Sequence, residues 1–324
     1  MIHLDDDTIS ELLDLASVTD VVGSAFTAWG QGTANTTQRV RAPTSTAMAS
    51  AMAAVVPPYS GGKVYATKNG RFTFVNVLFN IDGELLCTLD GEALTAFRTP
   101  AACALAIRAL AVDSSTGHRI TTAALIGAGR QGWHHLEMLA AELPQLTDVR
   151  IADLDRGAAS RMSERAQQIG IPARAVADAT TTVDGADVIV TVTQSSTPLF
   201  PAAAIGDSTL ICAVGATKYD RCEIGPDVVQ RCQTVVCDDV AGSRAECGDL
   251  IQANAAGAFH WEQAVELHAV MAGTASVARA GSAPALFETQ GVALQDVAAA
   301  GLTWERYRNR ENAANSRNDR ENRS

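Results

Sequence analysis

The residues Gly127-Ala128-Gly129-Arg130-Gln131-Gly132 have the types and spacing that bind a dinucleotide. They follow an apolar run at residues 123–126 and precede a helical pattern, which is the context that a G-x-G-x-x-G motif requires. Gly127 permits a tight turn, Gly129 lets the backbone approach a pyrophosphate at the helix N-terminus, and Gly132 lets the helix pack close to the strand. The alternative interpretation is a glycine-rich turn in some other α/β protein.

Asp153 ends the predicted strand that follows this motif. An acid at that place hydrogen-bonds the ribose 2′-hydroxyl of NAD and repels the 2′-phosphate of NADP, so NAD(H) is predicted over NADP(H). Arg156 and Arg150 lie nearby in the sequence and oppose this preference, and Asp153 has the alternative role of capping the next helix. The segments Thr191-Val192-Thr193 and Val214-Gly215-Ala216 end later apolar runs and are expected to complete the cofactor site.

Composition excludes several classes of function. The 324 residues contain 25 Lys and Arg against 36 Asp and Glu, a net charge of −11. No nucleic acid partner is expected, because binding to phosphates needs clustered cations. A hydrophobic content of 47% fits a globular protein with a core. The richest apolar stretch, at residues 101–112, is too short to span a membrane, so no membrane partner is expected either.

The cysteines give no sign of a metal site or a disulfide framework. Their number, seven, is odd, and they lack a Cys-x-x-Cys pair and metal-ligand spacing. Reduced, mostly buried thiols are therefore predicted, with no metal. The N-terminus has neither the basic start nor the apolar run of a secretory signal, so a cytoplasmic location is expected.

Two regions with different patterns must position these residues. The first begins with helical spacing, including the capping-box form Thr8-Ile9-Ser10-Glu11. Asp82-Gly83 predicts a hairpin, and a long Ala- and Leu-rich helix is expected over residues 92–112. Strand-like stretches, which predict a mixed α+β region with mostly antiparallel pairing, lie at residues 38–42, 52–56, 63–67, 72–79 and 84–89.

After Gly117 the pattern changes to strands that alternate with helices. This alternation is typical of parallel βαβ units and predicts an α/β fold with a Rossmann dinucleotide-binding domain. Strands are expected at 122–126, 148–152, 188–192, 210–214 and 235–237, and helices at 131–143 and 156–169. A last helix is expected over residues 292–307, and the polar tail at 308–324 is predicted to be disordered.

Four motifs in this chain resemble those of the ornithine cyclodeaminase/mu-crystallin family. They are Pro57-Pro58-Tyr59-Ser60 with Lys63, the stretch over residues 89–102, the glycine motif, and Ala213-Val214-Gly215-Ala216. Residues 246–250 and 291–296 also look like the family. The resemblance implies a Rossmann domain at 118–291, inserted in a substrate-binding and dimerisation domain at 1–117 and 292–324. It also implies a homodimer formed through the N-terminal domain.

The same resemblance implies that Arg41, Lys63 and Arg98 hold the carboxylate of an amino or imino acid. The chemistry is suitable, because a small carboxylate in a water-poor site needs a guanidinium or an ammonium to offset its desolvation. The alternative for each cation is a solvated surface charge. Arg39 shares a strand face with Arg41 and is a rival for its role.

Thr217 separates two reactions within the family. The cyclodeaminases of the family have an Asp two residues after the Val-Gly-Ala/Gly stretch, and it acts as a base on the substrate amine. Here Val214-Gly215-Ala216 is followed by Thr217, which resembles the ketimine-reductase branch. Asp220 lies three residues further on and is the alternative base.

The leading hypothesis is therefore NADH-dependent reduction of an imine of a 2-oxo acid, cyclic or acyclic, to the amino acid, or the reverse dehydrogenation. Lys63, Arg98 and Thr217 are the candidate catalytic residues. The alternatives are an ammonia-lyase of the ornithine or lysine cyclodeaminase type and a non-enzymatic small-ligand binder like mu-crystallin. Lys68-Asn69-Gly70-Arg71 either recognises a second carboxylate or forms a polar loop, and the loop is the preferred interpretation.

Overall fold

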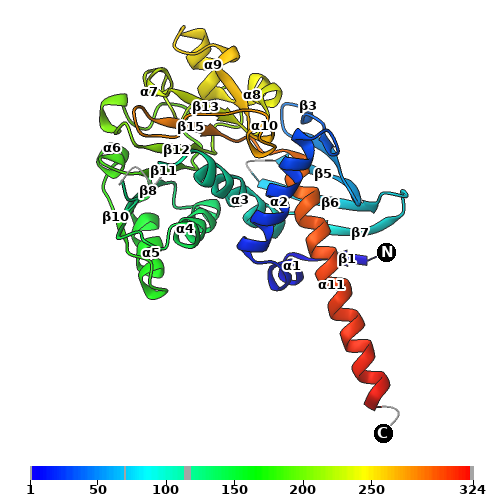
Figure 1. Ribbon diagram of the computed structural model, residues 1–324. Helices are drawn as coiled ribbons and strands as arrows, with labels where there is room; N and C mark the ends of the chain where they lie inside the picture. Colours follow the sequence, from blue (N-terminus) through cyan, green and yellow to red (C-terminus); the bar gives the residue numbers. More distant parts are fainter. Residues whose placement is uncertain (1, 69–70, 113–117, 322–324) are drawn as a thin grey trace. The chain divides into compact units, whose positions relative to one another are not determined.

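The chain divides into two compact units (Figure 1). The computed structural model describes residues 2–68, 71–112 and 118–321. Unit 1 comprises residues 1–98 and 292–324, and unit 2 comprises residues 99–291. The boundary predicted at residue 117 lies outside the described residues. The division falls instead after Arg98, inside the long helix α3 (Glu92–Leu110).

Unit 1 is built on a seven-stranded sheet with the order β1-β7-β6-β5-β4-β2, in which β3 also pairs with β4. All neighbours pair antiparallel except β1 with β7. The expected hairpin at Asp82-Gly83 joins β6 to β7, and Gly83 has a φ of 87° there. The strands are β1 (Ile2–Leu4), β2 (Asn35–Thr36), β3 (Val40–Pro43), β4 (Met48–Val56), β5 (Tyr59–Lys68), β6 (Arg71–Asn80) and β7 (Leu85–Asp90). Asn69 and Gly70 of the predicted polar loop lie outside the described residues.

One face of this sheet packs on helices and forms the core of unit 1. The helix α11 (Ala293–Glu321) crosses β4, β5 and β6 and packs against α2 (Leu15–Gly30), while α1 (Asp6–Leu12) contacts β7. Alternate strand residues point to the helices, because side chains in a strand alternate between the two faces. The buried ones include Met52, Lys63, Tyr65, Leu78 and Leu89. A lysine is thus buried in a row that is otherwise mostly apolar.

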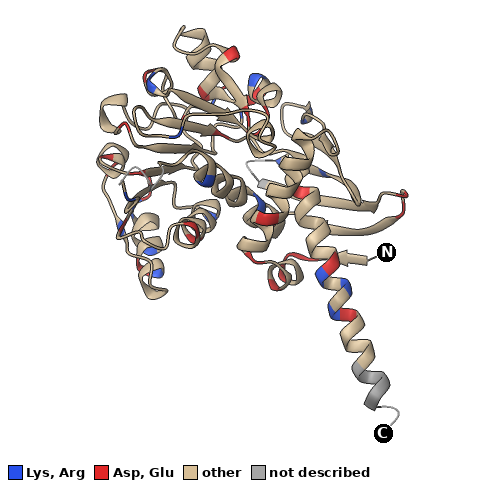
Figure 2. Cartoon of the chain, viewed as in Figure 1, with Lys and Arg blue, Asp and Glu red and all other residues tan. Residues whose placement is uncertain are grey.

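The C-terminal helix is longer than the sequence pattern predicted. Disorder was expected from Arg308, but α11 continues to Glu321. Charges of both signs lie along the polar part of this helix (Figure 2), and Glu305, Arg306 and Arg310 are among them. Arg310 lies 3.2 Å from Glu11 and Arg306 lies 2.8 Å from Asp14, so the first polar turns of α11 contact the N-terminal segment.

Unit 2 contains an eight-stranded, wholly parallel sheet with the order β10-β9-β8-β11-β12-β15-β13-β14. This is the Rossmann arrangement that the alternating pattern predicted, with helices as the crossovers. The strands are β8 (Thr122–Ile126), β9 (Asp148–Ala152), β10 (Ala173–Ala175), β11 (Val188–Thr191), β12 (Leu210–Ala213), β13 (Thr234–Cys237), β14 (Ala264–Glu266) and β15 (Ala285–Glu288). Continuous apolar runs make the central strands fully buried, as both faces of a parallel sheet are covered.

The helices of unit 2 follow the strands in turn. The longest are α4 and α5, which flank the strands β8 and β9. The set is α4 (Arg130–Glu142), α5 (Arg156–Gln168), α6 (Ala179–Val183), α7 (Pro226–Arg231), α8 (Val240–Glu246), α9 (Gly248–Ala255) and α10 (Leu267–Met271), with the 3₁₀ turns η2 (Ala202–Ala204) and η3 (Trp261–Gln263). By length and composition, α3 alone among the described helices is apolar enough to cross a membrane, but 78% of its apolar stretch is buried, as in a core helix.

Candidate active site

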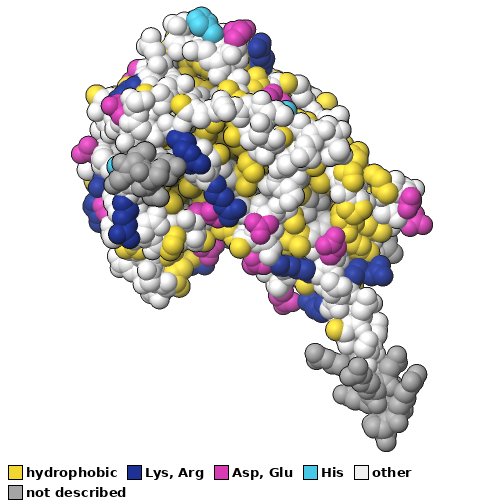
Figure 3. Space-filling view, in the orientation of Figure 1, with side chains coloured by type: hydrophobic (Ala, Val, Ile, Leu, Met, Phe, Trp, Pro, Cys, Tyr) yellow, Lys and Arg dark blue, Asp and Glu magenta, His cyan; other side chains and the backbone are white. Residues whose placement is uncertain are grey.

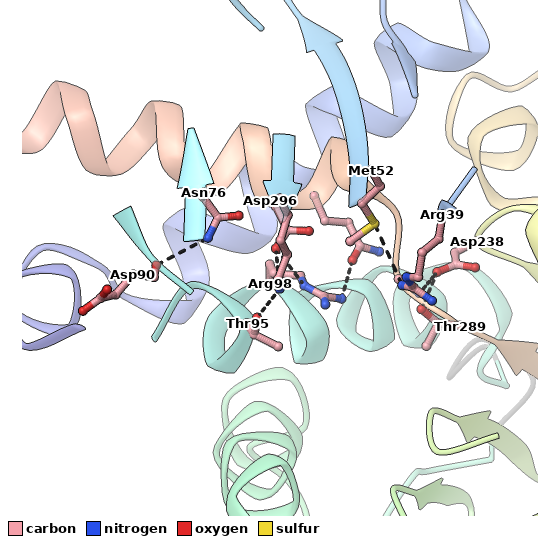
Figure 4. A network of polar contacts seen from close by, with 12 residues as sticks. Arg39, Met52, Asn76, Asp90, Thr95, Arg98, Asp238, Thr289 and Asp296 are labelled. Atoms are coloured by element: carbon pink, nitrogen blue, oxygen red, sulfur yellow. Dashed lines mark hydrogen bonds and ion pairs between the residues drawn. The ribbon is translucent and has the colours of Figure 1, made fainter. Parts of the chain in front are cut away.

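In unit 1, Lys63 belongs to a buried cluster of charges. Figure 4 labels Thr95, Arg98 and Asp296 of this cluster. The Nζ atom of Lys63, on β5, donates to Thr95 Oγ1 at 2.6 Å and to Asp296 Oδ1 at 3.2 Å. The same carboxylate oxygen lies 3.4 Å from Arg98 Nε, and Arg98 Nη1 donates to Gln295 Oε1 at 2.9 Å. The exposed fractions are 1% for Lys63, 7% for Arg98 and 1% for Asp296. Two of the predicted cations therefore share one buried counter-ion.

The alternative of solvated surface charges is wrong for Lys63 and Arg98, since both are buried. Burial lowers the pKa of Lys63 to about 8. The negative charge of Asp296 opposes this shift, and the positive charges of Arg98 and Arg39 add to it. An amine with a pKa of about 8 is partly deprotonated close to neutral pH, whereas an exposed lysine is almost fully protonated there. Its Nζ also lies 4.4 Å from the centre of the Phe74 ring.

The cluster holds polar atoms that have no hydrogen-bond partner among the described residues. Asp296 Oδ2 and Gln295 Nε2 are both buried and unpaired in this way. Buried polar groups are normally paired with protein, water or ligand, so such atoms mark a place where a polar ligand is expected. Thr95, Gln295 and Asp296 were not among the sequence-predicted site residues, although 291–296 was one of the family-like segments.

Arg41 lies on β3, and no described contact joins it to Lys63. It is opposite Ser50 of β4, while Lys63 is opposite Met52. The rival Arg39 is closer to the row of Lys63, because its Nη2 lies 3.9 Å from Met52 Sδ and its charge lowers the pKa of Lys63. Both arginines are half-buried. The role of Arg41 stays a prediction, and Arg39 is at least as well placed.

In unit 2, Gly127 and Gly132 have the steric roles that the sequence predicted, and Gly129 leaves the space that its predicted role needs. Gly127 follows β8 with a φ of 114°, and a Cβ there would lie 2.5 Å from Val192 O. A Cβ on Gly132 would lie 2.0 Å from Gly127 O, so α4 packs directly on the turn. A Cβ on Gly129 would meet no described atom within 4 Å. Gly129 therefore leaves open space at the N-terminus of α4, where a pyrophosphate binds in Rossmann folds.

The start of α4 is suited to an anion. Its N-cap is Gly129, and no side chain caps it within the described residues. The first N–H groups of a helix and its dipole attract negative charge, and a side-chain cap would compete with a ligand for them. Arg130 and Gln131 form the first turn, next to the predicted pyrophosphate position.

Asp153 lies directly after β9, at the predicted position. Its Oδ2 accepts a hydrogen bond from Ala128 N at 2.7 Å, and its Oδ1 accepts one from Asp155 N at 2.8 Å. The alternative in which Asp153 caps the next helix is wrong, because Asp155 is the N-cap of α5. Arg156 begins α5 with an exposed side chain. The carboxylate of Asp153 is therefore fixed against the glycine turn.

The two remaining cofactor segments follow β11 and β12, which are neighbours in the sheet. Val192 N donates to Ile126 O and Val214 N donates to Thr191 O, each at 2.9 Å, so both segments continue the parallel ladder beyond the strands. Ala216 is buried. Thr217, half-buried, follows in a tight turn in which its N–H donates to Gly215 O at 2.8 Å. Thr193 and Gly215 both contact a buried acid, Glu223, that the sequence reasoning missed.

Asp220, the alternative base, is exposed, whereas Thr217 is half-buried. A general base must lie within hydrogen-bond reach of the proton that it removes, and a partly desolvated position favours such a role. Of the two residues, Thr217 is the one that directly follows the cofactor segment Val214–Ala216.

Comparisons with known proteins agree with this architecture. A profile of the ornithine cyclodeaminase/mu-crystallin family matches residues 1–311. The chain is 39% identical over 218 residues to the Delta(1)-pyrroline-2-carboxylate reductase 1 of Burkholderia multivorans. That match covers 67% of this chain and 64% of the relative, so it spans less than two thirds of the relative's length.

Solved structures match over nearly the whole chain. A probable ornithine cyclodeaminase from Bordetella pertussis has a TM-score of 0.88 at 33% identity, covering 95% of this chain and 97% of that one. The iminosuccinate reductase of Paracoccus denitrificans, solved with NAD+, has a TM-score of 0.87 at 26% identity, covering 96% and 97%. This chain is therefore a member of the ornithine cyclodeaminase/mu-crystallin family.

Proposed function

We propose that this protein is an NADH-dependent reductase that converts an imine of a 2-oxo acid to the amino acid, and that catalyses the reverse dehydrogenation. The observation that carries the proposal is the buried Lys63–Asp296–Arg98 cluster, which joins a proton donor of lowered pKa to a guanidinium suited to a carboxylate. Two relatives bear names of such enzymes, a pyrroline-2-carboxylate reductase and an iminosuccinate reductase.

A nicotinamide dinucleotide fits unit 2, because an uncapped helix N-terminus, the open space at Gly129 and the acid Asp153 lie together around the glycine turn. The N-terminus of α4 at Gly129 would hold the pyrophosphate, with Gly127 and Gly132 shaping the turn around it. Asp153 would hold the adenosine ribose, and Thr191–Thr193 and Val214–Ala216 would hold the nicotinamide half. When bound, NADH supplies a hydride to the imine carbon.

The residues of unit 1 supply the rest of the chemistry. Arg98 binds the substrate carboxylate through its guanidinium, and Arg41 or Arg39 supplies a second cation. Lys63 gives a proton to the imine nitrogen as the imine carbon accepts the hydride, so the C=N double bond becomes a C–N single bond with a new N–H and a new C–H bond. Asp296 holds the ammonium of Lys63 in place and keeps its pKa from falling further.

Thr217 favours the reductase over the cyclodeaminase. Removal of ammonia from ornithine needs a base on the substrate amine, and a threonine hydroxyl does not ionise near neutral pH. Reduction of an imine adds a proton to nitrogen instead, so it does not need that carboxylate. The exposed Asp220 is a poor substitute.

The test is a screen of NADH oxidation with pyrroline-2-carboxylate, piperideine-2-carboxylate, and 2-oxo acids with ammonia or methylamine. We expect turnover of at least one imine and no proline or pipecolate from ornithine or lysine with catalytic NAD. Ammonia release from ornithine would show a cyclodeaminase. Dinucleotide binding without turnover of any imine would show a non-enzymatic binder.

For the cofactor, we propose a preference for NADH over NADPH. The reason is Asp153, whose carboxylate would face the 2′-phosphate of NADPH. Comparison of kcat/KM for the two cofactors measures the preference, and Asp153→Ser should narrow it. Equal use of NADPH by the wild type would contradict this assignment.

We also propose that the protein forms a homodimer through the free face of the unit 1 sheet. Val40, Ala51, Val64 and Val75 are paired in register and form a row across β3, β4, β5 and β6. Val40 is 65% exposed and Val64 is 49% exposed. Figure 3, seen from the side of α2 and α11, shows further hydrophobic side chains over the end of the sheet at β6 and β7. Contiguous exposed apolar side chains of this kind are typical of an interface.

A cytoplasmic location remains part of the proposal. All seven cysteines are free thiols, and six of them are buried, which suits a reducing compartment.

A further inference from the structure

Glu223 is a buried acid that the proposed reaction does not use. Its side chain is 0% exposed, and it lies between the turn at Thr217 and the helix α7. A buried carboxylate is costly unless it is paired or hydrogen-bonded, so its presence needs a physical explanation. No Lys or Arg appears among its principal interactions.

The carboxylate of Glu223 joins the segments that follow β11 and β12. Its Oε2 accepts hydrogen bonds from Thr191 Oγ1 at 2.9 Å and from Gly215 N at 2.7 Å. Its Oε1 accepts one from Thr193 N. Thr191 is the last residue of β11, Thr193 lies two residues beyond it, and Gly215 belongs to the segment after β12. One side chain therefore joins the end of β11 and the residues after it to the segment after β12, just beyond the last ladder hydrogen bond from Val214 N to Thr191 O.

The junction leaves no room for another side chain. A Cβ on Gly215 would lie 2.1 Å from Thr193 O and 2.6 Å from Glu223 Oε1. The two backbones thus approach as closely as their atoms allow, and the carboxylate of Glu223 fills the remaining space. This explains Gly215 by a close approach and not by a turn, since its φ is not positive.

The backbone of Glu223 is held by a second buried acid, Asp249. Asp249 Oδ1, on α9, accepts a hydrogen bond from Glu223 N at 2.7 Å, and Asp249 is 0% exposed. Burial raises the pKa of Glu223, while the three donors oppose that shift. Burial and the charge of Glu223 raise the pKa of Asp249 to about 7. Hydrogen bonds to both oxygens favour the ionised form of a carboxylate, and this offsets part of the cost of burying Glu223.

A metal site is not the explanation for this acidic group. In the part of the chain that the structure describes, no three His, Cys, Asp or Glu side chains are arranged to hold a metal ion. The contacts of Glu223 are instead with backbone N–H groups and a hydroxyl, which a carboxylate orients without any cation.

We propose that Glu223 is a positioning residue for the nicotinamide half of the cofactor. The inference rests on the proposed dinucleotide binding in unit 2. In a Rossmann fold, ligands bind beyond the carboxyl ends of the parallel strands, and β11 and β12 end where Glu223 holds the backbone. The glycine turn and Asp153 lie at other strand ends, β8 and β9, and bind the other half of the cofactor. Glu223 therefore acts on one half only.

This division gives a direct test with two ligands. ADP-ribose carries the adenosine and the pyrophosphate but lacks the nicotinamide ring. In Glu223→Gln, the amide places an N–H group against Gly215 N or Thr193 N, so one donor loses its acceptor. We expect the Kd of NADH, measured by calorimetry, to rise about tenfold and the Kd of ADP-ribose to change less than about twofold.

Asp249→Asn is the matched control, because it also replaces a buried acid by its amide but keeps an oxygen for Glu223 N. In Asp249→Asn, the ratio of the Kd of NADH to the Kd of ADP-ribose should be the same as in the wild type. Thr191→Val removes one donor without a change of shape, and should raise only the Kd of NADH, about threefold. If the Glu223→Gln variant does not fold, the Thr191→Val variant tests the proposal in its place.

The outcomes separate the two proposals. Equal weakening of NADH and ADP-ribose, or unchanged NADH binding in a folded Glu223→Gln variant, would overturn the positioning role while cofactor binding stands. Failure of the wild type to bind either ligand would overturn the dinucleotide site and the positioning role with it. Normal binding without imine turnover would refute the reductase alone, because the comparison of Kd values needs no catalysis.

Discussion

At the scale of single residues, Asp296 changes the interpretation of the cations. The family resemblance implied that Lys63 and Arg98 bind a substrate carboxylate. In the structure both side chains already contact the carboxylate of Asp296. Lys63 and Asp296 are separated by 233 positions in the chain, so no local pattern relates them. A substrate must therefore bind to a cluster that is already partly neutralised, and the lysine is better suited to give a proton than to bind an anion.

This arrangement predicts a pH effect for Asp296→Asn. A general acid works in its protonated form, so activity is lost as the pH rises through the pKa of Lys63, about 8. The carboxylate of Asp296 raises that pKa, and its removal lowers it. A pKa one unit lower leaves about tenfold less protonated lysine at high pH. The alkaline limb of kcat/KM for a preformed imine should therefore move to lower pH.

Glu305→Gln is the control, because Glu305 lies on the same helix and, among the described residues, accepts a hydrogen bond from Tyr59 Oη at 2.9 Å and none from Lys63. Its alkaline limb should coincide with that of the wild type. If Asp296→Asn left the limb unchanged, Lys63 would not be the proton donor.

Arg98 gives a second prediction at this scale. In Arg98→Ala, loss of a charge-assisted contact with the substrate carboxylate should reduce kcat/KM for the imine. The reduction should correspond to a loss of about 2–4 kcal/mol of transition-state stabilisation. The KM for NADH should change little. Arg108→Ala is the comparison, since Arg108 lies on the same helix but pairs with Glu142 with 46% of its side chain exposed. The measurement is steady-state kinetics in which the imine and NADH are varied in turn. If Arg98 had only a structural role, kcat/KM would fall equally for the imine and for NADH.

At the scale of elements, the glycine turn allows stability and binding to be separated. A Cβ at Gly129 meets no described atom, so Gly129→Ala should cost only about 1 kcal/mol as a poorer N-cap. It should still weaken NADH binding at least about tenfold, because the methyl group occupies the approach of the pyrophosphate. Thermal unfolding and titration with NADH measure the two effects.

Gly132→Ala should show the opposite balance. Its Cβ would lie 2.0 Å from Gly127 O, so the backbone must move at a cost of about 1–3 kcal/mol. A clear fall in the unfolding temperature is expected. Equal stability of the two variants would mean that the turn differs from the geometry described for unit 2.

How far the sequence predicted the elements depends on whether local patterns define them. The strands β8 and β9 and the hairpin at Gly83 have clear signals in apolar runs and turn residues, and were predicted within a few residues. The strand β15 has four residues and inserts between β12 and β13, an order that only tertiary pairing decides. The start of α1 was also predicted wrongly. Asp5 is the N-cap and accepts a hydrogen bond from Thr8 N, so the capping box predicted with Thr8 as its first residue is wrong.

The candidate site divides in the same way. The glycine turn and Asp153 were predictable because one short segment and the next strand contain the whole signal. Asp296 and Glu223 were not, since each acts through partners on other elements. A buried acid looks like any other acid in a sequence, and only its burial reveals that it must have a role.

At the scale of the whole molecule, the question is how the free face of the unit 1 sheet is covered. Val64 lies near the middle of the apolar row, between Ala51 and Val75, with 49% of its surface exposed. In a monomer Val64→Lys should fold normally, because a lysine at an exposed strand position keeps its charge in water. In a dimer it would bury two charges, and truncating or charging a central contact typically costs about 2 kcal/mol or more.

We therefore expect the wild type to sediment as a dimer and Val64→Lys to sediment largely as a monomer at micromolar concentration, with its unit 2 still able to bind ADP-ribose. Ile169→Lys is the control, because Ile169 is 59% exposed but lies at the end of α5 in unit 2. It should remain dimeric. A wild-type monomer, or a dimer that tolerates Val64→Lys, would mean that this face is covered by something other than a second copy of the chain.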